Sequence, residues 1–300
     1  MDTSSLTAFS EAIAELVEGS ARHTATVYGR RRLPATGIVW SEGMIVTASH
    51  VVERDEEIEI AVTAGERRSA TVAGRDPATD LVLLRIEGGG LTPAPRAGQA
   101  ALPGPLGIAV GRAGAGTPHV SIGVINAVDY AVRVGQSRII EPVLQSEIVM
   151  LPGFSGGPLL NTAGEVLGLN SSHIGRGNSL TLTVAAISPI LDALATHGKL
   201  RRGYLGIGAQ AVGISASQVK DAALAQEVGL VILSIDEGGP AQGAGLLIGD
   251  IVIAVGGAPV ASVDDLVEHL PGELIGSQTP VTIVRGAQRQ EVSVTVGERG

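Results

Sequence analysis

Three side chains that could together carry out acyl transfer stand in short, distinctive segments of the 300-residue sequence. His50 lies in "TASHVV", Asp80 opens "DLVLLRI", and Ser155 lies in "PGFSGGP". A serine hydroxyl is a weak nucleophile, so a neutral histidine must take its proton, and a carboxylate must fix the imidazole tautomer and stabilise the imidazolium. The glycines beside Ser155 allow backbone N–H groups to turn toward a developing oxyanion. The chain order His, Asp, Ser is one of the known orders of such a triad.

Many short strands must position these residues. Apolar runs rich in Val, Ile and Thr are separated by Gly and Pro, a pattern that predicts a barrel or sandwich and not a parallel α/β sheet. Residues 87–106 have no apolar period and predict a connection between two sheets. His50 and Asp80 precede this connection and Ser155 follows it, so each sheet would supply one wall of a cleft. The strands are expected over residues 24–29, 44–49, 57–62, 69–74, 80–86, 120–126, 142–148, 164–170 and 180–186.

Helices and a second, mixed α and β region complete the expected layout. An amphipathic helix is predicted over 4–17, and a second helix with Ser188 as N-cap and Pro189 in its first position, ending near His197. From Arg201 onward we expect strands over 204–210, 229–235, 250–256, 279–285 and 291–296, and helices over 217–226 and 263–270. The expected domains are an N-terminal helix over 1–20, a double barrel over 21–199 and a C-terminal domain over 202–300.

Four segments resemble those of the HtrA/Deg family of serine proteases, and the likeness extends over about residues 22–300. They are "TASHVV", "RDPATDLVLLRI", "LPGFSGGPLLNTAGEVLGLN" and "RGYLGIG". The resemblance implies a mainly β fold, in which a trypsin-like double six-stranded β-barrel is followed by an α+β PDZ domain. It implies that His50, Asp80 and Ser155 form a catalytic triad, and that the backbone N–H groups of Gly153 and Ser155, with Phe154 between them, form the oxyanion hole.

The implied function is that of a serine endopeptidase. It would hydrolyse peptide bonds in unfolded or misfolded proteins through an acyl-enzyme at Ser155, as part of protein quality control. Met150 and the segment Asn170 to His173, with Asn170, Ser171 and His173 as the site residues, correspond to walls of the primary specificity pocket, and they suggest an apolar or small side chain before the scissile bond. The family usually has Asn at the position of Phe154, whose apolar ring could shape or partly cover the oxyanion hole.

The segment "YLGIG" resembles the carboxylate-binding loop of PDZ domains. Consecutive backbone N–H groups of Leu205, Gly206 and Ile207 would capture the C-terminal carboxylate of a peptide, which would then add a strand beside residues 207–211. A packing domain without a ligand is the alternative for this region. For the whole chain, the rival interpretation is a catalytically silent chaperone or a PDZ peptide-binding adaptor.

Other motifs in the sequence are weaker. "GFSGG" matches the nucleophile elbow of α/β-hydrolases, but Gly156, Gly157 and Pro158 disfavour the helix which that fold places after its serine. "GIGAQA" matches the dinucleotide-binding motif G-x-G-x-x-A, but that motif needs a helix to begin at its glycines, and here the glycines fall inside a predicted strand. Asp76 lies four residues before Asp80 and could compete for the role of the acid.

Composition limits the partners and cofactors. The net charge of −9 argues against nucleic acid. With no cysteine and no metal-ligand spacing among the histidines, we expect no metal, no cofactor and no disulfide. The sequence has no apolar run long enough to span a bilayer. A cytoplasmic location is expected, with the periplasm or cell envelope as the alternative if an N-terminal anchor was removed. The family resemblance further implies a homo-oligomer, a trimer or a multiple of it, assembled through the N-terminal segment around Phe9 and Tyr28.

Overall fold

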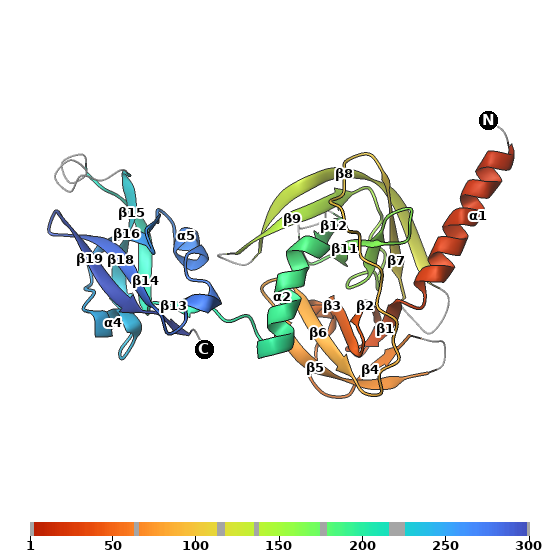
Figure 1. Ribbon diagram of the computed structural model, residues 1–300, viewed down its shortest axis with the longest axis horizontal. Coiled ribbons are helices and arrows are strands. Elements are labelled where there is room, and N and C mark those ends of the chain that lie inside the picture. Colours follow the sequence, from red (N-terminus) through yellow and green to blue (C-terminus); the bar gives the residue numbers. More distant parts are fainter. Residues whose placement is uncertain are drawn as a thin grey trace. The chain divides into compact units, whose positions relative to one another are not determined.

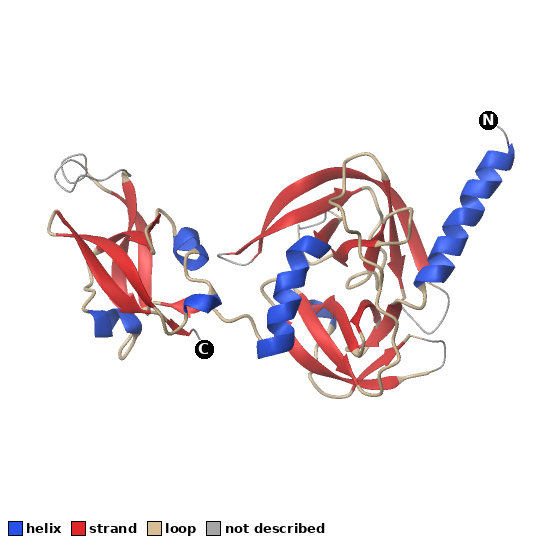
Figure 2. Cartoon of the chain, in the orientation of Figure 1, coloured by secondary structure: helices blue, strands red, loops and turns tan. Residues whose placement is uncertain are grey.

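The computed structural model describes residues 3–62, 66–112, 118–134, 138–174, 179–215 and 226–298. Contacts between residues divide the chain into two compact units, of which the larger contains residues 1–135 and 139–200 and the smaller contains residues 201–300. Nearly all of the helix predicted over 217–226 lies outside the described residues. The units are shown in Figure 1, and the predominance of strands in Figure 2.

The first barrel is closed, with strands in the order β1-β2-β3-β6-β5-β4. Side chains that alternate along these strands fill its interior, among them Val27, Ile45, Ile60 and Val82. The strand β2 was not among the predicted strands, because six consecutive residues of it are buried and leave no alternation to recognise. The strands are β1 (Thr24–Tyr28), β2 (Ala35–Ser41), β3 (Met44–Ala48), β4 (Ile58–Ala61), β5 (Arg68–Asp76) and β6 (Leu81–Ile86).

A second closed barrel follows, with strands in the order β10-β11-β12-β9-β8-β7. The two barrels confirm the predicted mainly β, double-barrel architecture. Two of these strands, β7 and the short β10, were also missed by the sequence analysis. The strands are β7 (Leu106–Gly111), β8 (His119–Val134), β9 (Arg138–Ser146), β10 (Pro158–Leu160), β11 (Val166–Ser171) and β12 (Leu180–Thr183).

The two barrels share a core that holds their outer faces together. In β6, Leu81 and Leu83 belong to this shared core, whereas Val82 and Leu84 belong to the interior of the first barrel. Burial on both faces explains why "LVLL" is a continuous apolar run. The second barrel contributes Val143, Leu169 and Leu182, among others, to the shared core.

Two helices accompany the barrels. The helix α1 (Thr3–Ser20) forms where the periodicity predicts one; Leu16 and Val17 pack against the shared core, while Leu6 and Phe9 are exposed. The helix α2 (Val184–His197) packs against strands of both barrels. The prediction of Ser188 as its N-cap is wrong. Thr183 caps the helix by accepting a hydrogen bond from the N–H of Ala186, and Pro189 lies inside the helix.

The second unit contains a six-stranded antiparallel sheet flanked by short helices. Its strands follow the order β14-β15-β16-β18-β19, with β17 paired to β16, and Leu230, Val252, Ile283 and Val294 lie in its core. Five predicted strands and the predicted helix at 263–270 are confirmed within a few residues. The elements are β13 (Gly203–Tyr204), β14 (Ile207–Gly213), β15 (Val228–Ile235), α4 (Pro240–Ala244), β16 (Ile251–Val255), β17 (Ala258–Pro259), α5 (Val263–Glu268), β18 (Gln278–Arg285), β19 (Gln288–Thr295) and β20 (Gly297–Glu298).

Candidate active site

Strand pairing in the first barrel brings His50 to Asp80. His50 lies in a 3₁₀ turn, Ser49–Val51, directly after β3, and Asp80 directly precedes β6. In the ladder between these strands Ala48 stands opposite Leu81. The residue before His50 donates its N–H to the Asp80 backbone carbonyl at 2.8 Å, and the His50 N–H donates to Asp80 Oδ1 at 2.9 Å. The two segments are therefore fixed against each other by the backbone as well as by their side chains.

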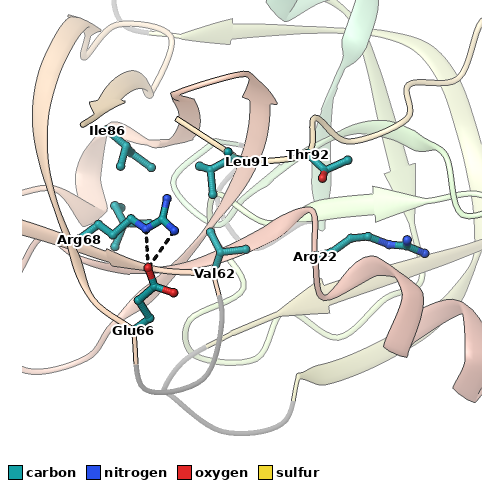
Figure 3. Close-up of a pocket in the computed structure, with 9 residues that line it drawn as sticks. Arg22, Val62, Glu66, Arg68, Ile86, Leu91 and Thr92 are labelled. Carbon is teal, nitrogen blue, oxygen red and sulfur yellow. Dashed lines mark hydrogen bonds and ion pairs between the residues drawn. The ribbon is translucent and has the colours of Figure 1, made fainter. Parts of the chain in front are cut away.

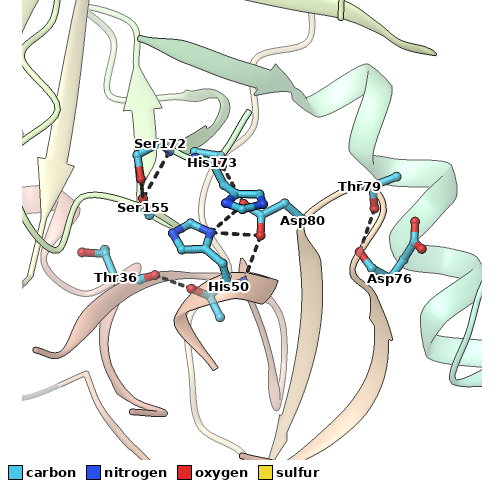
Figure 4. A network of polar contacts seen from close by, with 10 residues as sticks. Thr36, His50, Asp76, Thr79, Asp80, Ser155, Ser172 and His173 are labelled. Carbon is cyan, nitrogen blue, oxygen red and sulfur yellow. Dashed lines mark hydrogen bonds and ion pairs between the residues drawn. The ribbon is translucent and has the colours of Figure 1, made fainter. Parts of the chain in front are cut away.

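The Asp80 carboxylate orients the imidazole of His50 (Figure 4). His50 Nδ1 lies 2.8 Å from Asp80 Oδ2 and 3.0 Å from Oδ1. Because a carboxylate only accepts hydrogen bonds, Nδ1 carries the proton, and Nε2 of the neutral ring is left as the acceptor. The side chain of Asp80 is 3% exposed, and Ser171 Oγ also donates to its Oδ2, at 2.6 Å. These bonds offset the cost of burying the charge.

Asp76, the possible competitor of Asp80, has a different place. Its backbone carbonyl accepts hydrogen bonds from the N–H and the hydroxyl of Thr79, in the turn that leads to Asp80. Figure 4 shows Asp76 beside Thr79 and apart from His50. Asp80, and not Asp76, is the carboxylate that contacts the imidazole.

Three consecutive residues, the last of β11 and the two that follow it, connect Ser155 to Asp80 and His50. Ser171 contacts Asp80, Ser172 Oγ lies 2.8 Å from Ser155 Oγ, and the ring of His173 stacks on that of His50 with centroids 5.3 Å apart. The Ser172 N–H also donates to Ser155 Oγ at 3.3 Å. Among the described residues, Ser155 Oγ makes these hydrogen bonds and none to His50. The segment 171–173 thus touches all three members of the predicted triad.

The backbone around Ser155 leaves two N–H groups unused. The N–H of Phe154 donates to Leu151, that of Gly156 to Asn170, and that of Gly157 to Phe154. Within the part of the chain that is described, the N–H groups of Gly153 and Ser155 have no acceptor. These are the two donors that the family resemblance implies for the oxyanion hole. Gly153 has a φ of 89°, a backbone conformation that residues other than glycine rarely adopt.

The side chain of Phe154 does not cover this loop. It is fully buried in the core of the second barrel, together with Ala109, Ile125 and Leu159. Its ring lies against Gly111, where any side chain would collide with it. The expectation that the ring could cover the oxyanion hole is therefore wrong, because the space left by a glycine accommodates the ring inside the barrel.

The four residues predicted for the specificity pocket lie in different surroundings. Asn170 is fully buried and accepts a hydrogen bond from Thr181 Oγ1 at 2.7 Å. Met150 is partly buried against the core of the second barrel. Ser171 and His173 contact Asp80 and His50, as described above. Ser172 lies within the predicted pocket segment 170–173, but its contact with Ser155 was not predicted, although the polar run "NSSH" after an apolar strand could have indicated it.

The predicted carboxylate loop of the second unit joins β13 to β14. Gly206 has a φ of 75°, its carbonyl accepts from the N–H of Asp236, and the carbonyl of Leu205 accepts from the N–H of Ala241. In the described part of the sheet β14 pairs only with β15, so the other edge of β14 is open. The helix α5 contacts β14. The loop thus adjoins a free strand edge, where an added strand would fit.

One further hollow lies away from these sites. A hollow of about 160 Å³ in the first barrel is lined by Arg22, Glu66 and Arg68, among others (Figure 3). The charge of Arg68 is paired with Glu66 at 2.8 Å. Across the described residues, no three His, Cys, Asp or Glu side chains are grouped as metal ligands would be. The same residues include no helix that is both long and apolar enough for a membrane span.

Comparisons with known proteins match both units. The trypsin-like peptidase domain family matches residues 35–169, and the PDZ domain family matches residues 204–296. The chain is 31% identical over 268 residues to a probable periplasmic serine endoprotease DegP-like of Pseudomonas fluorescens, covering 87% of this chain and 55% of the relative. A protein of the same description from Halomonas elongata is 30% identical over 283 residues, covering 90% and 57%. The chain therefore spans about half the length of the curated relatives it matches.

Solved structures match over nearly the whole chain. A serine endoprotease from Yersinia pestis has a TM-score of 0.77 and 26% identity, covering 96% of this chain and 98% of that one. The HtrA-type protease AlgW, solved with a decapeptide, has a TM-score of 0.74 at 22% identity, with 96% and 98% covered, a likeness that supports the fold alone.

The expectation of a cytoplasmic protein is wrong, because the curated relatives are named periplasmic. That expectation rested on the lack of an apolar run or a signal-peptide-like stretch in the sequence, together with the lack of cysteine. None of these absences decides the compartment, and a protein without disulfides folds in either one.

Proposed function

Because the chain belongs to the HtrA/Deg family, with a trypsin-like peptidase domain followed by a PDZ domain, we propose that it is a serine endopeptidase with Ser155 as its nucleophile. The observation that carries this proposal is the contact of the segment 171–173 with Asp80, Ser155 and His50 together. The rival function, a silent chaperone or adaptor, would require none of these contacts.

In the proposed mechanism, His50 Nε2 takes the proton of Ser155 as Oγ attacks the scissile carbonyl carbon. Asp80 stabilises the imidazolium that forms. The free N–H groups of Gly153 and Ser155 donate to the oxyanion, each contributing about 3–4 kcal/mol to the stability of the transition state. His50 then protonates the leaving amine, and the acyl-enzyme at Ser155 is hydrolysed by water with His50 acting as base again.

The test compares wild type with Ser155→Ala on an unfolded protein substrate, together with covalent labelling by an organophosphonate. Wild type should cleave and label, and Ser155→Ala should do neither, because the nucleophile is gone. Ser188→Ala is the matched control; Ser188 donates within α2, to Val184, away from the triad. A wild-type protein that neither labels nor cleaves would leave only the peptide-binding alternative.

The PDZ domain is proposed to bind the C-termini of peptides, including those of unfolded substrates. A free carboxylate would accept from the N–H groups of Leu205, Gly206 and Ile207, and the peptide backbone would pair with the open edge of β14. A peptide with a free C-terminus should bind more tightly than its amidated form, as measured by calorimetry. Gly206→Ala should weaken binding because of the positive φ, whereas Gly213→Ala, in open space at the far end of β14, should not. Equal affinities of the two peptides would exclude capture of the carboxylate.

We further propose a homo-oligomer in the periplasm or cell envelope, built through α1. On this helix Leu6 is 54% exposed and Phe9 is 50% exposed, an apolar stripe that a second copy could cover. Light scattering should give the mass of a trimer or a multiple of it for wild type and a smaller mass for Phe9→Ser. The control Glu15→Ser changes the opposite side of the helix and should leave the mass unchanged. A monomeric wild-type protein would reject this assembly.

A further inference from the structure

Thr36 on β2 is fully buried and joins the first barrel to the loop that carries Ser155. Its hydroxyl lies 2.7 Å from the carbonyl oxygen of Gly153, and the N–H of Arg112 points at the same hydroxyl at 2.6 Å. Its own N–H donates to the Ser155 carbonyl at 3.4 Å. One side chain therefore links a strand of the first barrel, the end of β7 and the loop around Ser155.

The direction of these hydrogen bonds follows from the groups involved. A backbone N–H can only donate, so the Thr36 oxygen accepts from Arg112, and its single proton is directed to the Gly153 carbonyl. The Thr36 carbonyl is occupied as well, by the hydroxyl of Thr47 at 2.6 Å. The side chain therefore has one arrangement in which every group is satisfied, and buried polar groups of this kind hold their geometry firmly.

The Gly153 carbonyl belongs to the peptide group that joins Gly153 to Phe154. Its other side is fixed too, because the Phe154 N–H donates to Leu151 at 3.1 Å. Hydrogen bonds thus hold both sides of this peptide group, and the N–H groups of Gly153 and Ser155, which belong to the peptide groups before and after it, have no acceptor among the described residues. Glycine at 153 could otherwise rotate readily, since it lacks a Cβ.

We propose that Thr36 is a positioning residue for the oxyanion hole: its hydroxyl holds the Gly153 carbonyl in the first barrel and so keeps the two flanking N–H groups directed at the reacting carbonyl. The proposal rests on the function proposed above, and it adds a residue from the opposite barrel that touches neither substrate nor nucleophile side chain. Without the hydroxyl, the loop would spend much of its time in conformations that lack a formed hole.

The test measures kcat and KM for a fluorogenic peptide built on a cleavage site mapped with the wild-type enzyme. Thr36→Val keeps the shape and removes the hydroxyl; it should lower kcat by about 10- to 100-fold, as expected when a buried hydrogen bond that holds one conformation is lost. KM should change by less than about 2-fold, because ground-state contacts are kept. A peptide aldehyde, which forms an oxyanion with the serine, should bind more weakly by the same factor as kcat falls. Thr36→Ser, which restores the hydroxyl, should recover kcat to within about 3-fold.

Thr24→Val is the matched control. Thr24 is also buried in the first barrel and donates its hydroxyl to a backbone carbonyl, that of Ser20, so its replacement costs stability without touching the loop. Its kcat should equal that of wild type. If Thr36→Val does not fold, Thr36→Cys keeps a weak donor of similar size and should show an intermediate kcat.

The outcomes separate the two proposals. A wild-type enzyme that is active while Thr36→Val, or Thr36→Cys in its place, keeps its kcat would overturn the role of Thr36 alone. An equal loss of kcat in Thr24→Val would do the same, because the effect would then be one of stability. A wild-type protein without labelling or cleavage would overturn the proposed function and the role of Thr36 with it.

Discussion

Replacing Ser172 by Ala is expected to make Ser155 a faster nucleophile. In the resting structure the hydroxyls of these two residues lie 2.8 Å apart. If Ser155 is the donor, its proton points away from His50; if Ser172 is the donor, a lone pair of the attacking oxygen is occupied. In the first case the contact must break before Ser155 can attack, and in the second it competes with the attack for a lone pair.

The size of the effect follows from the strength of that contact. A hydrogen bond between neutral groups contributes about 0.5–1.5 kcal/mol net, and about 1.4 kcal/mol is a factor of ten in rate. Ser172→Ala should therefore raise the rate of acylation by about 2- to 12-fold. The weaker bond from the backbone N–H of residue 172, at 3.3 Å, remains in the variant and favours the lower half of this range.

The assay is the second-order rate constant for labelling by an organophosphonate, because this rate reports the attack of Ser155 Oγ on the phosphorus, with loss of its leaving group, and involves no deacylation step. Ser179→Ala is the control; Ser179 is close in sequence and donates to the Ile148 carbonyl instead. A rate for Ser172→Ala equal to or below that of wild type, with the control unchanged, would show that the contact does not restrain the nucleophile.

Three further predictions concern the acid, the barrel core and the second unit. Asp80→Asn should lower kcat by about 10⁴-fold, because an amide stabilises the wrong imidazole tautomer; single-turnover hydrolysis measures this, and a loss below ten-fold would contradict it. Phe154→Ala should destabilise the protease unit by about 3–5 kcal/mol, since the ring is fully buried; urea unfolding followed by the fluorescence of Trp40 measures the loss, and a change under about 1 kcal/mol would refute it. Burial raises the pKa of Asp250, but hydrogen bonds from Arg285 and a backbone N–H, with the charge of Arg285, outweigh it and hold the pKa below its ordinary value. The resulting stability is present above the ordinary Asp pKa, about 3.9, and is lost as the pH falls through the lower folded value. The protection factors of the β18 amides, which correct for the intrinsic pH dependence of exchange, should therefore fall in acid, and Arg285→Gln should flatten that dependence; identical pH profiles of the protection factors would contradict the role of the pair.

Local patterns in the sequence determined much of this protein. The alternation of isoleucine at 58 and 60 with glutamate at 57 and 59 is enough to predict a half-buried strand. The residue types in the segments around His50, Asp80 and Ser155 are enough to indicate acyl-transfer chemistry. These features are local because a strand has a fixed side-chain period and a nucleophile needs small neighbours. The same holds for the strands of the second unit.

Tertiary structure alone decided the features that depend on two distant segments. The strand β2 is buried on both faces, so it has no period to detect; the core shared by the two barrels creates that burial. Phe154 lies in the barrel and not over the loop because Gly111, on another strand, leaves it room. The contacts of Thr36 with Gly153 and of Ser172 with Ser155 likewise arise only when strands far apart in the chain close into barrels. A single segment of sequence records its own side-chain types and spacing, but it does not record which distant segment will lie against it.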